Sequence, residues 1–182
     1  MTEHSVAQGV WANIRLAIFD VDGVLTDGRL LFDAEGRESK VFHVRDGHGL
    51  KMLQKAGIEI AFITARYSPA LAYRAQDLGV SRVYQGSLDK RLAYRELKLE
   101  LGLEDAVIAY MGDDLIDLPI LTSAGLATCP SDAHPEVLAR VHWCAQAPGG
   151  GGAVREFCEN LLKAQGHWDR LLDAYLSVEG RG

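Results

Sequence analysis

Apolar and polar positions follow one another in blocks that predict strands and helices in turn. Four short apolar runs predict buried strands, at residues 16–19, 58–63, 81–84 and 106–111. Amphipathic stretches predict helices that begin near Gly47, Ser87, Leu115, Pro135 and Gly152, and at Pro69 after the cap Ser68. Glycines predict where four of the helices end, at Gly57, Gly79, Gly102 and Gly125. This alternation predicts a three-layer, Rossmann-like α/β fold, a parallel sheet with helices on both faces.

Polar residues follow each of the predicted strands at the point where the strand ends. Open α/β sheets bind ligands outside the carboxyl ends of their strands, so we expect these residues to meet in one crevice. The cation of the set, Lys90, opens a strongly helical segment that runs to about Leu101. In chain order the set is Asp20 with Asp22, Thr64 with Arg66, Lys90, and Asp113 with Asp114 and Asp117.

The pair Asp20 and Asp22 is the most informative part of this set. Residues two apart on a strand point the same way, so both carboxylates can reach one pocket. Two ionised acids repel, and the pair therefore needs a cation or a raised pKa on one member. Mg²⁺ suits one or two carboxylates together with phosphate oxygens. Taken singly, each polar residue is as well explained by a helix cap, a turn or a solvated surface position. All of them, in this order at strand ends, favour phosphoryl chemistry.

The stretch between the first two strands is too short for a separate cap domain. Residues 29–32 and 40–44 flank residues 33–36 and predict a β-hairpin, inserted at about residues 28–44. Apolar side chains fall on both faces of this hairpin, and a lone two-stranded hairpin is marginal in water. We therefore expect a capless homo-oligomer, a homotetramer, in which partner subunits bury the hairpin. The alternative is a hairpin folded back on its own domain.

The carboxyl-terminal part predicts one more helix and a tail. The glycine run at residues 149–152, after Pro148, predicts a flexible joint before a helix over residues 153–165, and this joint is either part of a functional lid or a plain domain-end linker. The expected division is a capless phosphohydrolase domain at residues 1–166 and a tail at residues 167–182.

Composition narrows the class of protein. The 182 residues suit one catalytic domain, and the net charge of −6 argues against a nucleic-acid partner. No apolar run approaches the roughly 18 residues of a membrane span, and the amino terminus has no basic region followed by an apolar core, so we expect a cytoplasmic location with no membrane partner. The three cysteines have neither metal-ligand spacing nor an even number and read as core residues.

The ordered motifs resemble the haloacid dehalogenase superfamily of phosphohydrolases. Its four motifs match residues 20–23, Thr64, Lys90 and residues 112–114. A closer resemblance, to the 3-deoxy-D-manno-octulosonate 8-phosphate phosphatase family, is carried by DVDGVLTDG at 20–28, VRDG at 44–47, GDDLIDLP at 112–119, DAHP at 132–135 and GAVRE at 152–156. Two positions depart from that family: His43 stands where Asn is frequent, and Gly151 where Arg is frequent.

The resemblance implies a mechanism and a set of residue roles. Asp20 would be the nucleophile and Asp22 the general acid and base, with Lys90 and Thr64 holding phosphate oxygens. Mg²⁺ would be held by Asp20, Asp113 and the main-chain carbonyl of Asp22. The substrate would be a small phosphorylated sugar acid used in lipopolysaccharide biosynthesis, and a neighbouring subunit's tail would close the site. The residues that contact the substrate would be Asp22, His43, Arg45, Asp46, Gly47, Arg66, Arg74 and Lys90.

Three alternatives stay open at this stage. A phosphatase for a related nine-carbon sugar-acid 9-phosphate would share every motif. A phosphoaccepting signalling domain also combines clustered acids, Thr, Lys and Mg²⁺, but it does not need the acid–base residue Asp22. An oligomeric interaction protein with an inactive phosphatase fold is the third, although every expected catalytic residue is present.

Overall fold

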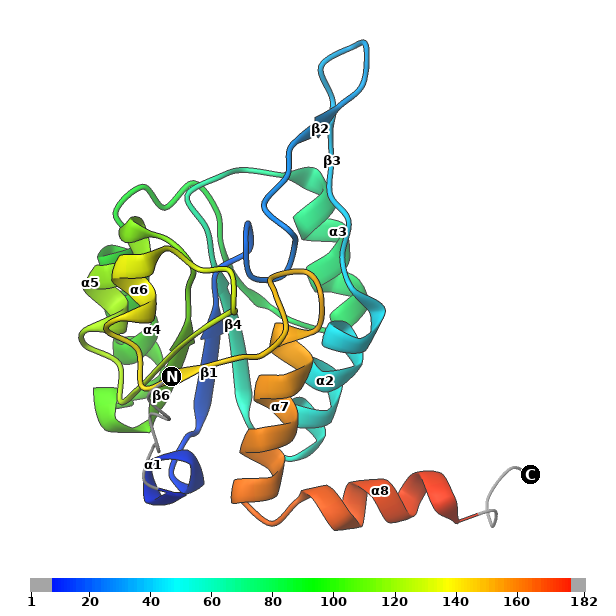
Figure 1. Cartoon of the computed structure of the whole chain (residues 1–182), viewed down its shortest axis with the longest axis vertical. Coiled ribbons are helices and arrows are strands. Elements are labelled where there is room, and N and C mark those ends of the chain that lie inside the picture. The colour runs from blue at the N-terminus through cyan, green and yellow to red at the C-terminus, as the bar shows by residue number, and fades with distance from the viewer. Residues whose placement is uncertain (1–7, 178–182) are drawn as a thin grey trace.

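The computed structural model describes residues 8–177, and the part of the predicted tail beyond residue 177 and the first seven residues lie outside it. A six-stranded sheet runs through the centre of the molecule (Figure 1). Its order is β5-β4-β1-β6-β7-β8, with every pair parallel. The strands are β1 (Leu16–Phe19), β4 (Glu59–Ile63), β5 (Arg82–Tyr84), β6 (Ile108–Met111), β7 (Leu126–Cys129) and β8 (Trp143–Cys144).

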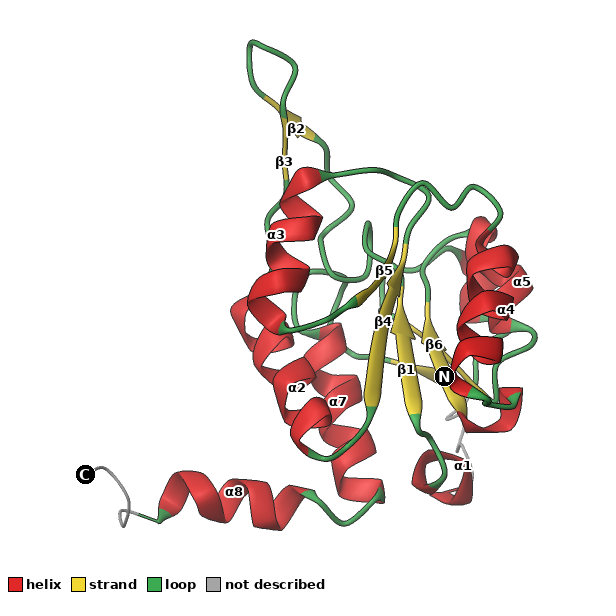
Figure 2. Ribbon diagram, turned by 180° about the vertical axis from the view of Figure 1, so that it is seen from behind, coloured by secondary structure: helices red, strands yellow, loops and turns green. Residues whose placement is uncertain are grey.

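Helices cover both faces of this sheet, which confirms the predicted three layers (Figure 2). On one face lie α1 (Gln8–Ala12), α2 (Val44–Lys55), α3 (Pro69–Leu78) and α7 (Ala153–Ala164). On the other lie α4 (Lys90–Leu101), α5 (Leu118–Leu121) and α6 (Pro135–Leu138), with 3₁₀ turns η1 (Asp105–Val107) and η2 (Leu115–Asp117) nearby. Strand β1 shows why: Ala17 and Phe19 enter one core, and Leu16 and Ile18 enter the other.

Several predicted boundaries need correction. Residues 106–107 belong to η1, so β6 begins only at Ile108. The sequence reading named neither β7 nor β8, which have four and two residues and lie among turns. Gly79 and Gly102 do end helices with positive φ, as predicted. Gly125 does not; it lies tight against the Asp105 and Ala106 carbonyl oxygens.

The inserted hairpin is present but its second arm is shifted. Strands β2 (Leu31–Phe32) and β3 (Glu38–Ser39) pair antiparallel, whereas residues 40–44 were predicted as the second arm. The Asp33 carboxylate accepts hydrogen bonds from the backbone N–H groups of Glu35 and Arg37, which closes the turn early. Residues 40–43 are therefore outside the paired strands but still within the insertion, and α2 begins at Val44.

The hairpin projects from the body, as both views show (Figures 1 and 2). Leu31, Phe32 and Val41 are 60, 52 and 74% exposed. The alternative in which the hairpin folds back on its own domain is therefore wrong. No other insertion covers the sheet edge within residues 8–177, so the fold is capless.

The glycine run at residues 149–152 is a packed loop, and the predictions of a flexible joint and of a plain linker are wrong. The backbone N–H of Gly150 donates to the Val24 carbonyl, and that of Gly149 donates to the Asp132 carboxylate. A β-carbon on Gly149 would collide with the Gly23 carbonyl oxygen, so this loop is seated on the segment that follows β1. Helix α7 then packs against α2, and a further helix, α8 (Trp168–Leu176), lies in the predicted tail. No helix among the described residues has the length and apolar character needed to cross a membrane.

Candidate active site

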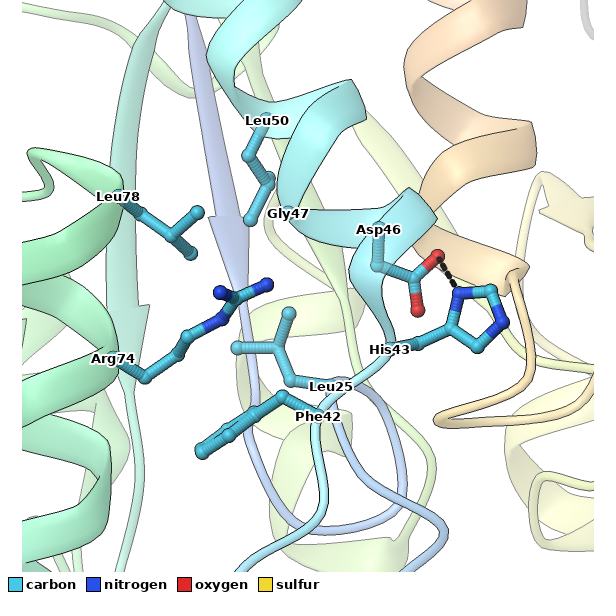
Figure 3. A pocket seen from close by; sticks show the side chains of 8 residues that line it. All are labelled: Leu25, Phe42, His43, Asp46, Gly47, Leu50, Arg74 and Leu78. Carbon is cyan, nitrogen blue, oxygen red and sulfur yellow. Dashed lines mark ion pairs between the residues drawn. The ribbon is translucent and has the colours of Figure 1, made fainter.

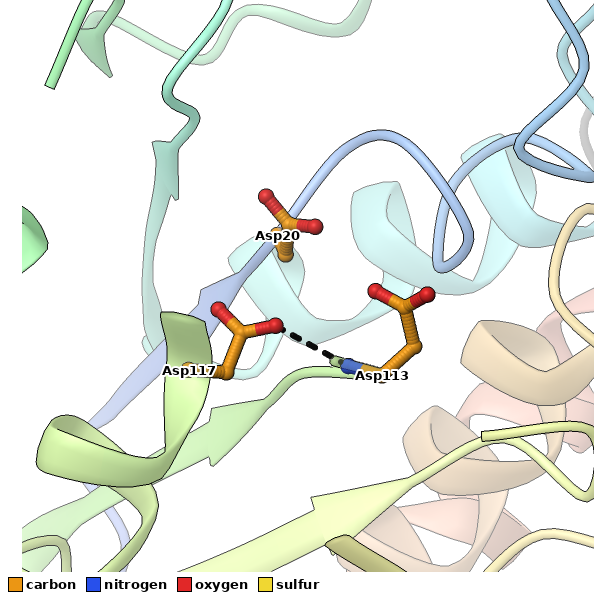
Figure 4. A group of neighbouring side chains, drawn as sticks. All are labelled: Asp20, Asp113 and Asp117. Atoms are coloured by element: carbon orange, nitrogen blue, oxygen red, sulfur yellow. Dashed lines mark hydrogen bonds between the residues drawn. The ribbon is translucent and has the colours of Figure 1, made fainter. Parts of the chain in front are cut away.

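The carboxyl ends of β1 and β6 bring three carboxylates together (Figure 4). Asp20 follows β1, Asp113 follows β6, and Asp117 ends η2 one turn later. Ligand atoms of the three lie within 4.8 Å of one another. Parallel pairing of β1 with β6, in the register Phe19↔Met111, is what puts Asp20 and Asp113 at the same edge.

Lys90 provides the positive charge of this cluster. Its ammonium group donates to Asp20 Oδ1 at 2.6 Å and to Asp117 Oδ1 at 2.7 Å, and the side chain is 1% exposed. Burial by itself lowers the pKa of a lysine, but the attraction of Asp20 and Asp117 outweighs it, and the pKa of Lys90 is raised. Lys90 therefore stays charged at neutral pH.

Asp117 is a hub that orients its neighbours. Its Oδ1 accepts from Lys90 and from the Tyr110 hydroxyl, at 2.7 and 2.5 Å. Its Oδ2 accepts from the backbone N–H groups of Asp113 and Asp114, at 3.1 and 3.2 Å. Asp117 thus caps the start of η2 and also holds the Lys90 ammonium group. Tyr110 was not predicted, because it is hidden in the apolar run of β6.

The aspartates carry more negative charge than Lys90 balances. Burial, and then repulsion by Asp117, raises the pKa of Asp20 to about 7, although Lys90 opposes this. Burial, then repulsion by Asp20 and Asp117, raises the pKa of Asp113 to about 8. Asp113 Oδ1 is also buried without a hydrogen-bond partner among the described residues. Hard oxygen ligands with unbalanced charge fit a divalent cation such as Mg²⁺.

Thr64 lies at the same edge, after β4. The register Phe19↔Phe62 between β1 and β4 sets it beside the segment that follows Phe19. The side chain is buried, and its hydroxyl accepts from the Arg66 backbone N–H at 3.2 Å. Asp114, by contrast, is exposed and caps η2, so its side chain serves the local turn.

Asp22 lies in a network of charges that the sequence did not reveal. Lys40 and Arg66 both form ion pairs with it, and both also form ion pairs with Glu38. The sequence did not indicate Lys40 and Glu38 because they belong to the insertion after β1, and no local pattern links them to Asp22. The side chain of Asp22 is not among the clustered ligand atoms of Asp20, Asp113 and Asp117.

The other predicted substrate residues lie around a second place, between α2 and α3 (Figure 3). His43, Asp46, Gly47 and Arg74 line a cavity of about 10 Å³, which is near the lower limit for one water molecule. Asp46 accepts from the Arg155 backbone N–H. A sugar acid does not fit this cavity.

Arg74 and Arg45 have different surroundings from Arg66. Arg74 pairs with Asp77 at 2.8 Å, and its guanidinium lies over the Phe42 ring and against Gly47. Arg45 is exposed on the first turn of α2. The structure thus brings only Arg66, of the three predicted arginines, into contact with Asp22.

Known proteins with similar sequences and structures agree on one family. No family model matches the chain. The 3-deoxy-D-manno-octulosonate 8-phosphate phosphatase KdsC of Yersinia pestis is 46% identical over 154 residues, which cover 85% of this chain and 82% of that protein. KdsC of Escherichia coli K12 is 43% identical over 157 residues, which cover 86 and 84%. A crystal structure of the Moraxella catarrhalis phosphatase, with magnesium ion, phosphate ion and a KDO molecule, superposes with a TM-score of 0.90 at 39% identity, over 92% of this chain and 97% of the other.

An aspartate after the first strand of a parallel α/β sheet, joined there by acids from a later strand and by a buried lysine, defines the haloacid dehalogenase class of phosphohydrolases. The 43–46% sequence identity to curated phosphatases, over most of the chain, narrows the assignment from this class to one family. This chain belongs to the 3-deoxy-D-manno-octulosonate 8-phosphate phosphatase family.

Proposed function

We propose that this chain hydrolyses 3-deoxy-D-manno-octulosonate 8-phosphate to the free sugar acid and phosphate. The observation that carries the proposal is the buried cluster of Asp20, Asp113 and Asp117 around Lys90, in a chain that is 43–46% identical to curated phosphatases for this substrate. Uncatalysed hydrolysis of a phosphate monoester is extremely slow, and proteins accelerate it chiefly by positioning and by offsetting charge. The cluster is suited to both.

Asp20 attacks phosphorus in line, and an Asp20–phosphorus bond forms while the bond to the sugar oxygen breaks. Asp22 gives a proton to the leaving oxygen and then takes one from the water that hydrolyses the aspartyl-phosphate. Lys90 offsets the charge on the transferred group, and the Thr64 hydroxyl donates to one of its oxygens. Asp117 keeps Lys90 in place through its 2.7 Å hydrogen bond.

The group that this site would hold is Mg²⁺, with Asp20, Asp113 and the main-chain carbonyl of Asp22 as its protein ligands. Bound there, the ion would supply positive charge that offsets the negative charge of the carboxylates and of the phosphate. The raised pKa values of Asp20 and Asp113 support this assignment, because burial and mutual repulsion disfavour the ionised carboxylates and a cation between them would offset both effects.

Specificity for a sugar acid would come from Arg66, whose planar guanidinium matches a carboxylate. Arg66 is 41% exposed, lies beside Asp22 and is held by Glu38. His43, Asp46, Gly47 and Arg74 are proposed to act one step away, by shaping the wall between α2 and α3, and the exposed Arg45 is proposed as a further substrate contact.

We also propose a homotetramer with the hairpin at its interface. The exposed Leu31, Phe32 and Val41 support this, since apolar surface of this kind is normally buried by association, and closed symmetry is the usual outcome. Light scattering tests it: a fully active protein with the 19.9 kDa mass of a monomer at micromolar concentration would contradict it. We further propose, from the sequence, a catalytic domain at residues 1–166 and a tail at residues 167–182. We also propose a cytoplasmic location.

A hydrolysis panel tests the proposed substrate. Phosphate release with Mg²⁺ is compared for octulosonate 8-phosphate, a nine-carbon sugar-acid 9-phosphate, a neutral sugar phosphate and an aryl phosphate. The highest kcat/KM is expected for octulosonate 8-phosphate. A higher kcat/KM for the nine-carbon ester would mean that this ester is the substrate, with the same phosphatase mechanism. The absence of turnover for every ester would contradict the proposed function.

A further inference from the structure

Lys40 is a buried lysine that the proposed mechanism does not use. It follows strand β3 of the hairpin, yet its side chain is only 3% exposed. Its ammonium group donates to Asp22 Oδ1 and lies 2.9 Å from Glu38 Oε1. A lysine is buried in this way only when its charge is paired, so the path of the chain after β3 is tied to Asp22.

Four side chains of alternating charge form a closed ring at this place. Lys40 and Arg66 are its cations, Asp22 and Glu38 its anions, and each cation contacts both anions. Burial tends to raise the pKa of Glu38, but the hydrogen bond that it accepts from Arg66 and the nearby positive charge of Lys40 outweigh this and lower it. These contacts link the segment after β1, the insertion that carries β3 and the segment after β4.

The two oxygens of Asp22 have different surroundings in this ring. Oδ1 is held by Lys40. Oδ2 is buried and accepts no hydrogen bond from the described residues, and the Arg66 Nε lies 3.9 Å away. A carboxyl group that gives and takes protons needs one oxygen that is free to do so. Lys40 holds Oδ1 of Asp22, and this contact fixes the direction in which Oδ2 faces.

We propose that Lys40 is a positioning residue for Asp22, which anchors one carboxylate oxygen so that the other can exchange a proton with the leaving group. This inference rests on the proposed phosphatase function. Without Lys40, Asp22 would keep only the longer contact with Arg66 and would lose its fixed direction. The hairpin thereby contributes to the chemistry, and not only to association.

The dependence of rate on the leaving group tests this role. A sugar alkoxide must receive a proton as it leaves, whereas dinitrophenolate is stable as an anion and leaves without one. The value of kcat/KM covers the step in which the leaving group departs. Lys40→Met should therefore lower kcat/KM on the order of 10²-fold for octulosonate 8-phosphate and less than about 10-fold for dinitrophenyl phosphate. Lys40→Arg, which keeps the charge, should recover most of the loss.

A double variant separates positioning from direct contact. If Lys40 acts through Asp22, Lys40→Met should cost no further activity in an Asp22→Asn background, because residues that act as a unit are not additive. A matched control is Lys51→Met, which removes an exposed lysine from α2 and should leave both esters unaffected. Equal losses of Lys40→Met on the two esters, or a loss that adds to that of Asp22→Asn, would overturn the proposal.

Folding is kept separate from positioning in the same experiment. Removal of Lys40 alone leaves Asp22 and Glu38 facing one cation, Arg66, and this can disturb the hairpin. The variant Glu38→Gln with Lys40→Met removes one charge of each sign, and it should show the same dependence on the leaving group, with an unchanged circular dichroism spectrum. Equal losses on the two esters in this double variant would overturn the proposal. A wild-type protein that is inactive on both esters would instead contradict the phosphatase function itself.

Discussion

Asp113 lies directly against the α-carbon of Gly23. A β-carbon built on Gly23 would come within 2.0 Å of Asp113 Oδ2, and the glycine has a φ of +92°. The loop after β1 and the loop after β6 can approach so closely only because this position has no side chain. Their contact is what holds Asp113 beside Asp20, so the geometry of the proposed Mg²⁺ site depends on a glycine that is not itself a ligand.

The first prediction follows from this contact. Gly23→Ala should remove Mg²⁺ binding and turnover, because the methyl group displaces the Asp113 carboxylate. Gly36→Ala is the matched control: it has a similar φ of +78° but no atom within 4 Å of the added carbon. Both variants should lose about 1 kcal/mol of stability from backbone strain, and only Gly23→Ala should lose activity. Calorimetric Mg²⁺ titration checks this, and normal Mg²⁺ affinity in Gly23→Ala would contradict it.

The second prediction concerns the hub at Asp117. Asp117→Asn replaces one acceptor oxygen by an NH₂ group, which clashes with the donors that Asp117 now serves. The expected loss in kcat is roughly 10–100-fold, typical for residues that orient others at a metal site. Tyr110→Phe removes only one of the four donors and should cost far less. Steady-state kinetics, with circular dichroism to monitor folding, rank the two; a larger loss in Tyr110→Phe would mean that the hub is the tyrosine.

The third prediction links Mg²⁺, pH and stability. The folded protein without Mg²⁺ raises the pKa of Asp20 to about 7 and of Asp113 to about 8, from 3.8 in the unfolded chain. Between about pH 4 and pH 8 the folded state therefore binds more protons than the unfolded state, and these residues make the free energy of unfolding fall as pH rises. Mg²⁺ binds the ionised carboxylates and removes this penalty.

The increase in melting temperature caused by Mg²⁺ should consequently be larger near pH 8 than near pH 5. Thermal unfolding with and without Mg²⁺ at both pH values measures it, and Asp113→Asn should reduce the difference. An increase that is the same at both pH values would show that Mg²⁺ binds elsewhere.

The fourth prediction concerns substrate recognition by Arg66. Arg66→Ala should weaken catalysis on octulosonate 8-phosphate by about 1.5–3 kcal/mol more than on a neutral sugar phosphate, which has the same type of leaving group but no carboxylate. Arg29→Ala is the control, because the Arg29 side chain is 88% exposed and pairs only loosely with Asp27. Kinetics on both esters decide the point: equal losses would mean that Arg66 serves Asp22 and Glu38 rather than the sugar acid.

Much of the site could be predicted because it depends on strand ends. The apolar run before Asp20 fixes the position of that residue at the sheet edge, and Lys90 is the first residue of α4 in the structure. Both facts follow from local pattern, since parallel strands bring their carboxyl ends together without further information.

What could not be predicted depends on contacts between distant segments. Lys40 reaches Asp22 only because the turn at Asp33 closes early and shifts the hairpin register. The glycine run that includes Gly149 predicts a flexible joint, because such a run looks the same in sequence whether it is free or packed against another backbone. Contacts between distant segments determine the register of the hairpin and the packing of the glycine run, and a local sequence pattern does not contain this information.

The nucleophile is the central claim, and it can be tested by trapping the intermediate. The protein is mixed with Mg²⁺ and octulosonate 8-phosphate, quenched with acid within one turnover, digested and examined by mass spectrometry. We expect one phosphoryl group on the Asp20 side chain of the wild-type protein, and neither label nor turnover in Asp20→Asn. Turnover by Asp20→Asn at about a tenth of the wild-type rate or more would contradict covalent catalysis at Asp20.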